Sequence, residues 1–233
     1  MKIYAPFTDF SQNPATLCVV GTDYYPPELP RGCPSCKRSN RRTGPPIVAE
    51  FHGRSKHLTD VLGFGWTAIS ERVRDALLPR FTGFEAWPVT FQEAAKRKRP
   101  PPKTSRRVRR APFPPPDAQY YWFEVTAGVP LYRERSTVEL GEPCPVCGRC
   151  SARILGREEY DHDVDPFVTP PITRRTPRQP GKGVFVRRED LGGHSVFFVE
   201  EFPGFILFTE PLRDFWLEQG FTGELLLEYG DVV

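Results

Sequence analysis

The sequence predicts an α+β fold made of two pseudo-repeated lobes, each with a cysteine knuckle followed by a helix–turn–strand unit. Short β-like runs are separated by proline and glycine, which is typical of small sheets joined by turns. Each half carries one Cys-Pro-x-Cys sequence, at residues 33–36 and 144–147. Each half also carries a capped amphipathic segment that leads through Phe-Thr-Gly into a β-like run, at residues 70–91 and 209–229.

The helix–turn–strand unit is the clearest internal repeat. Residues 70–83 and 209–223 share the pattern (S/T)-E-x-(V/L)-R-D-x-x-L followed by Phe-Thr-Gly, with Gly220 as the one inserted residue. Ser and Thr are good N-caps, and the acidic residue that follows favours the positive end of the helix dipole. We therefore expect helices at residues 70–78 and 210–219.

Other β-like runs complete the expected secondary structure. Pro88 lies inside one of these runs and indicates an edge strand, because proline has no N–H to donate to a neighbour. The expected strands are residues 16–20, 47–51, 84–91, 118–125, 184–186, 195–200 and 224–229.

Proline and positive charge divide the chain. The 233 residues include 27 prolines, about twice the average share, and these cluster in two regions. We expect an N-terminal lobe with the first knuckle at residues 1–95 and a basic, Pro-rich loop or linker at 96–116. The C-terminal lobe with the second knuckle then covers residues 117–233, with a Pro/Arg-rich linker at about 165–182.

Four of the six cysteines form the two knuckles. A Cys-x-x-Cys turn delivers two sulfur atoms, and two such turns complete the tetrahedral thiolate shell of Zn²⁺ without leaving a position for water. The sequence therefore predicts one structural zinc ion in a zinc-ribbon-like site shared by both lobes. Its expected ligands are Cys33, Cys36, Cys144 and Cys147.

The two remaining cysteines leave an alternative open. Cys150 lies three residues after Cys147 and offers a third thiol in that segment, so it is an alternative to one of the four ligands. Cys18 lies in an apolar β-like run, where a cysteine commonly serves as a small buried apolar side chain.

Several function classes lack support in the sequence. No apolar run is long enough to cross a bilayer, and no signal peptide is evident, so we expect a cytoplasmic protein without membrane contact. Thiols stay reduced there, which favours metal binding over disulfides. No catalytic triad, serine elbow or phosphate loop is recognisable, so we expect a protein that is not an enzyme.

The paired knuckles and the terminal helix–Phe-Thr-Gly–strand unit resemble the myxobacterial double-CXXCG motif family. The segment Cys144-Pro-Val-Cys147-Gly148 matches that motif in full, whereas Cys33-Pro-Ser-Cys36-Lys37 lacks the glycine. Members of the family are considered immunity proteins against lipoprotein toxins that pass between cells by outer-membrane exchange. The resemblance implies a cytoplasmic antitoxin that binds and neutralises one cognate protein toxin, and it implies no catalytic residues. A monomer suits such an inhibitor, so we expect a monomer.

The charge distribution supports an alternative partner. Residues 96–110 contain nine Lys or Arg and no acid. Because the whole chain carries +3 and this segment +9, the other residues carry −6. The basic segment would attract phosphates, so a zinc-ribbon protein that binds nucleic acid through residues 96–110 is the main alternative. A thiol-redox enzyme is a further alternative, since Cys-Pro-x-Cys motifs can lower a thiol pKa, but a matched pair of motifs favours a metal.

Deleting residues 96–116 should leave the melting temperature nearly unchanged, because this segment has no apolar face to bury and is expected to be a solvated arm. Thermal unfolding of the full and shortened chains, followed by circular dichroism, measures the difference. A large loss of stability in the shortened chain would show instead that the segment packs against the fold.

Overall fold

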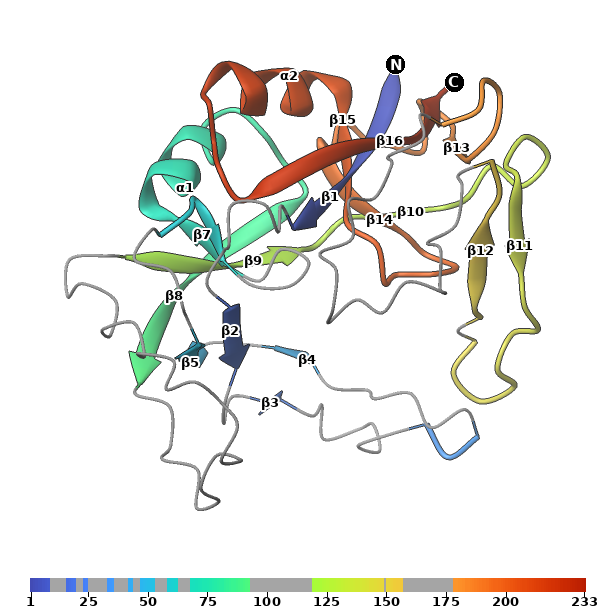
Figure 1. Cartoon of the computed structure of the whole chain (residues 1–233). Helices are drawn as coiled ribbons and strands as arrows, with labels where there is room; N and C mark the ends of the chain where they lie inside the picture. The colour runs from blue at the N-terminus through green and yellow to red at the C-terminus, as the bar shows by residue number, and fades with distance from the viewer. Residues whose placement is uncertain are drawn as a thin grey trace, which may run out of the picture.

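Figure 1 shows the computed structural model of the whole chain. Within the described residues the protein is mixed α+β, mostly sheet with two helices, which confirms the expected class. The basic loop expected at residues 96–116 and most of the second expected linker lie outside the described residues. The structure describes residues 1–8, 16–19, 23–24, 33–35, 42–43, 47–52, 58–62, 68–92, 119–148, 150–156 and 178–233.

Two six-stranded sheets form the body of the protein. The first sheet has the order β10 (Gly128–Val129), β14 (Val196–Val199), β15 (Leu207–Thr209), β1 (Lys2–Thr8), β16 (Glu224–Val232) and β13 (Val184–Val186). The second sheet has the order β6 (Val61–Leu62), β7 (Ala68–Ser70), β9 (Tyr120–Val125), β8 (Phe84–Gln92), β5 (Ile47–His52) and β2 (Thr16–Val19).

The two sheets share one plan over five strands, and the fifth in each is the strand that pairs antiparallel with the short one before the helix, β14 or β6. In each sheet, a central strand (β1 or β9) runs antiparallel to the short strand before a helix (β15 or β7) and to the long strand after it (β16 or β8). The long strand pairs on its other side with a parallel strand, β13 or β5. The registers agree as well. Tyr4 lies opposite Phe208 in the first sheet, and Tyr121 lies opposite Ile69 at the same place in the second.

The central strands are exchanged between the two halves of the sequence. Strand β1 begins the half expected at residues 1–95, yet it lies in the sheet built from C-terminal strands. Strand β9 begins the half expected at residues 117–233, yet it lies between β7 and β8. Each half therefore supplies the middle strand of the other half's sheet. Strand pairing is not local in sequence, so residue order alone could not indicate this exchange.

The helices α1 (Glu71–Leu77) and α2 (Glu210–Glu218) fall within the expected ranges. The Ser70 side chain accepts a hydrogen bond from the Val73 amide at 3.4 Å and caps α1. The Thr209 side chain makes no such bond, and the proline in the first turn of α2 leaves one amide fewer to cap. Neither of these helices has the length and apolar character needed to cross a bilayer.

The structure gives a physical reason for the repeated Arg-Asp of the two helices. Arg74 of α1 places its guanidinium 3.8 Å from the ring centroid of Tyr121 in the exchanged strand β9. Arg213 of α2 lies 5.1 Å from the ring of Tyr4 in the exchanged strand β1. Each arginine also contacts the aspartate that follows it. The repeated pattern thus holds each helix to the strand that the other half supplies.

One apolar cluster joins the two sheets and both helices, which lie on the same side of the molecule (Figure 1). Its rings come from both sheets: Phe123 of β9 lies 6.4 Å from Phe208 of β15, centroid to centroid. The turn after α1 meets α2 through Phe81 and Phe215, whose centroids are 5.3 Å apart. A second cluster covers the opposite face of the first sheet and contains residues such as Val129, Val199 and Leu207. The shared cluster therefore joins the two sheets, while the second cluster belongs to the first sheet alone.

The prediction that Pro88 marks an edge strand is wrong. Strand β8 lies inside its sheet, between β5 and β9. Pro88 pairs only with Tyr121 of β9, because the ladder to β5 begins at Val89. Pro88 therefore lies one residue before the pairing of β8 with β5 begins, so its lack of an N–H removes no hydrogen bond from the sheet.

The Thr-Gly turn after each helix docks on the other half. The carbonyl of Thr82 accepts from the Val196 amide at 3.1 Å, and the carbonyl of Thr222 accepts from the Val61 amide at 3.2 Å. The glycine after each threonine has a φ that disfavours other residues, +99° at Gly83 and +102° at Gly223. These turns thus tie each half to a short strand of the other, β14 or β6.

Gly83→Ala and Gly223→Ala should both destabilise the protein, by about 1–3 kcal/mol from backbone strain alone. Gly83→Ala should cost more, because its Cβ would run into the Val196 carbonyl, whereas the Cβ at Gly223 would approach the Val61 oxygen at 2.8 Å. Gly181→Ala is the matched control, since Gly181 has a φ of +71° and open space around it. Denaturant unfolding measures the free energy of unfolding of all three variants. Equal losses of stability in the three would show that the docking contacts of Gly83 and Gly223 do not contribute.

Candidate metal centre

Each knuckle lies in the connection of a small two-stranded ribbon. Strands β3 (Asp23–Tyr24) and β4 (Arg42–Thr43) pair antiparallel on either side of the first knuckle. Strands β11 (Val138–Leu140) and β12 (Ala152–Ile154) pair antiparallel on either side of the second. These ribbons were not predictable from the sequence, because strands of two or three residues carry no readable alternation.

The second ribbon is fixed to the sheet of C-terminal strands. Thr137, just before β11, accepts from the Leu155 amide at 2.8 Å through its carbonyl and from the Gly183 amide at 2.7 Å through its hydroxyl. Apolar side chains of both ribbon strands pack against the core cluster on that face of the sheet. The knuckle of this ribbon therefore has a defined position relative to the body of the protein.

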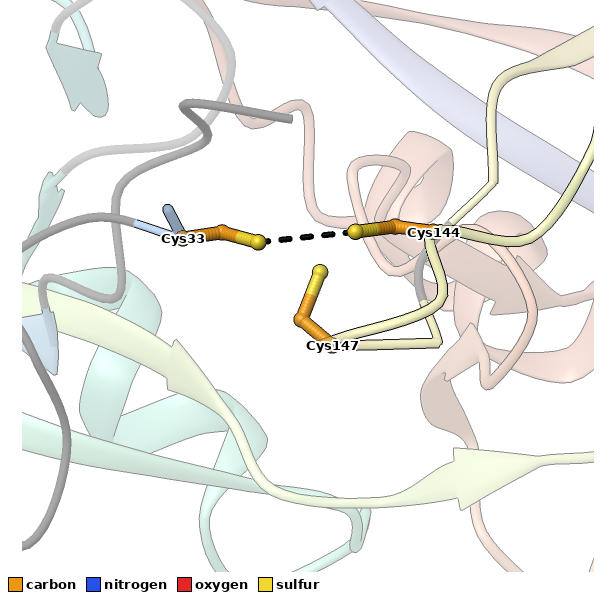
Figure 2. Close-up of side chains that lie close together, drawn as sticks. All are labelled: Cys33, Cys144 and Cys147. Carbon is orange, nitrogen blue, oxygen red and sulfur yellow. Dashed lines mark hydrogen bonds between the residues drawn. The ribbon is translucent and has the colours of Figure 1, made fainter. Parts of the chain in front are cut away.

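Three cysteines from the two ribbons point their sulfur atoms at one another (Figure 2). The Sγ atoms of Cys33 and Cys144 are 3.4 Å apart. Together with Cys147, all three sulfur atoms lie within 4.8 Å of one another. Thiolates on a tetrahedral zinc ion with bonds of about 2.3 Å stand roughly 3.8 Å apart, so this spacing fits a thiolate-bound metal. The cluster can hold a metal ion.

The second knuckle has the backbone of a tight turn. The Gly148 amide donates to the Cys144 carbonyl at 2.8 Å. Gly148 has a φ of +71°, a conformation that glycine adopts without strain. The Cys-x-x-Cys-Gly sequence thus turns both sulfur atoms to one side, and the glycine ends the turn.

The surroundings of Cys144 favour its thiolate form. The backbone N–H groups of Cys147 and Val146 lower the pKa of the Cys144 thiol to about 5, and the Cys33 and Ser35 side chains act in the same direction. Thiolate is the form that binds a metal ion. The sequence did not indicate these backbone donors or Ser35, because the direction in which an amide N–H points depends on the geometry of the turn.

The structure brings together three of the four expected ligands, Cys33, Cys144 and Cys147. The fourth, Cys36, lies outside the described residues. Cys150 is not among the three converging thiols; it donates to the Glu201 carbonyl at 3.1 Å and ties the end of the knuckle to the turn after β14. Cys18 lies in strand β2.

Cys33 and Cys144 are buried, with 2% and 8% of their surface exposed, and Cys147 is half-buried. A centre shielded in this way suits a structural role better than exchange with solvent. Because Cys33 comes from one ribbon and the other two thiols from the second, an ion bound here would join chain segments 111 residues apart.

Comparison of the sequence with protein-family models gave no match, and comparisons with curated proteins and with solved structures gave no significant match. The role of the chain must therefore be inferred from the cysteine centre and its place in the fold.

Cys33→Ser and Cys144→Ser should each lower both the bound metal and the free energy of unfolding, because metal-binding energy is also folding energy. Elemental analysis of the purified chain and its denaturant unfolding measure the two effects. Cys150→Ser is the matched control: a hydroxyl can still donate to the Glu201 carbonyl, so the metal content should stay unchanged. If Cys150→Ser loses as much metal as Cys33→Ser, the ligand set is different.

Proposed function

We propose that this chain is a non-catalytic binding protein whose two ribbons are held together by one structural Zn²⁺ ion. The proposed ligands are Cys33, Cys36, Cys144 and Cys147. The observation that carries the proposal is the convergence of thiols from two distant ribbons on one buried point. Four thiolates in a tetrahedral arrangement are typical of structural zinc and leave no open position for a substrate.

The shared strand plan supports duplication of the two lobes. In each half the chain runs through a ribbon with its knuckle, a parallel strand, two short strands, a helix and a long strand. We infer that each lobe is a copy of one unit, that the copies exchanged their first strands, and that their knuckles meet at the zinc ion. The shared site is then the point where the two copies meet outside their common core.

We further propose that the protein is a cytoplasmic, monomeric immunity protein that binds and neutralises one cognate toxin. The resemblance of residues 144–148 to the double-CXXCG motif supports this function, and the positive φ of Gly148 supplies a reason why the motif includes a glycine. Recognition of a partner needs a rigid surface, and the shared core and the zinc centre would together provide that rigidity.

The charge of the chain fits association with a basic toxin. Outside residues 96–110 the net charge is −6, because the whole chain carries +3 and that segment +9. Opposite charges on two partners speed their encounter and help to exclude wrong partners. The toxin contact would lie on the acidic surface of the lobes rather than at the shielded thiols.

Expressing this chain should rescue cells that produce the toxin encoded beside it, and no other toxin. The purified proteins should form a one-to-one complex, and the association rate should fall as salt rises. Cell survival and salt-dependent binding kinetics measure these effects. The control is Cys33→Ser, which should lose rescue only in proportion to its loss of folded protein.

A different set of results would contradict the immunity function. No protection, combined with sub-micromolar DNA affinity that disappears when residues 96–110 are deleted, would replace the immunity function with nucleic-acid binding. The zinc part of the proposal would remain intact in that case, since metal analysis tests it separately.

A further inference from the structure

The two sulfur atoms connected by the dashed line in Figure 2 come from different ribbons. Cys33 belongs to the first knuckle and Cys144 to the second, and their Sγ atoms are 3.4 Å apart. A disulfide has an S–S distance of about 2.05 Å. The two sulfur atoms therefore need to approach by only about 1.4 Å to reach bonding distance.

We propose that the metal centre is a redox switch, in which a hydroperoxide replaces the bound metal ion with a disulfide between Cys33 and Cys144. The inference rests on the metal-binding part of the proposed function and is independent of the toxin. Because the new bond joins the same two ribbons as the metal does, their connection survives the loss of the ion.

The reaction balances with hydrogen peroxide as the two-electron oxidant. One thiolate of the pair attacks a peroxide oxygen, the O–O bond breaks, and the hydroxide that leaves takes up a proton to become water. The resulting sulfenic acid is attacked by the second thiolate; the S–S bond forms, the S–O bond breaks, and a second hydroxide leaves as water after protonation. Both sulfur atoms are oxidised by one electron each, both peroxide oxygens are reduced, and the metal ion leaves with two of its ligands gone.

The exposure of the three thiols determines which oxidant can reach them and which other disulfide could form instead. Cys33 and Cys144 expose only 2% and 8% of their surface, so a small peroxide can reach them more readily than a bulky disulfide reagent. Cys147 is half-buried and is the most exposed of the three thiols. First attack at Cys147 is the competing course, and it would give a disulfide within the second knuckle or between Cys33 and Cys147.

The test uses the full chain loaded with Zn²⁺ and treated with hydrogen peroxide. A chelating dye reports the released metal, and non-reducing peptide mapping reports the bond. Trypsin places Cys33 and Cys36 in residues 32–37, and Cys144 and Cys147 in residues 136–149. We expect one ion released for each cross-link between these two peptides, and a dithiol reductant should reverse both changes.

Fragmentation of the linked peptides assigns the bond in the wild-type chain. A variant with Cys36→Ser and Cys147→Ser should still form the cross-link, as should the control Cys150→Ser, whereas Cys144→Ser should not. Release of the ion with a bond inside either peptide, a bond from Cys33 to Cys147, or retention of the ion under peroxide would each overturn the switch. A purified chain that binds no Zn²⁺ before treatment would instead contradict the proposed zinc site.

Discussion

The exchange of the two central strands is the constraint on which the rest of the structure depends. Strand β1 and strand β9 each complete the sheet of the other half, so neither half can bury its apolar face by itself. The consequence is a shared cluster in which Tyr4, Phe123 and Phe208 contribute rings from both sheets. The stacked arginines of the two helices and the two docked Thr-Gly turns then close around this cluster.

This arrangement changes what a metal ion has to do. The exchanged strands already hold the two halves together, so the ion is not needed to keep them joined. The first ribbon is the weak part, because strands β3 and β4 contain two residues each, and a two-stranded ribbon by itself is at best marginally stable. The second ribbon is anchored to the sheet of C-terminal strands. A metal shared by Cys33 and Cys144 would therefore position the first ribbon against an anchored one, and its binding energy would be the folding energy of that region.

The parts of the fold that were predictable from sequence are those fixed by local patterns. The caps and the Arg-Asp repeat placed both helices to within a residue or two, and the apolar run Val184–Val186 was predicted as a strand with its observed bounds. The meeting of Cys33 with Cys144 was also predictable, because each pair supplies half of a tetrahedral shell.

The parts that were not predictable depend on contacts between distant residues. Nothing in the sequence of β1 indicates which sheet it joins. Pro88 suggested an edge because it has no N–H, yet its strand is internal and tolerates the proline because the pairing to β5 starts one residue later. The ribbons around the knuckles were missed because their strands are too short for a periodicity. The spacing of Cys150 could not show that it contacts the Glu201 carbonyl and is not among the three converging thiols.

The chemistry of the knuckle explains why a metal fits this centre better than free thiols do. Three sulfur atoms lie within 4.8 Å of one another, and several thiolates at that spacing would repel strongly without a cation. The turn amides of Val146 and Cys147 favour negative charge on Cys144, so this sulfur is the one best prepared to bind an ion. The neighbouring thiols must give up their protons as the ion binds. A metal ion would thus take the place of protons that the crowded centre would otherwise keep, and this exchange would make the affinity for the ion rise with pH until the thiols are deprotonated.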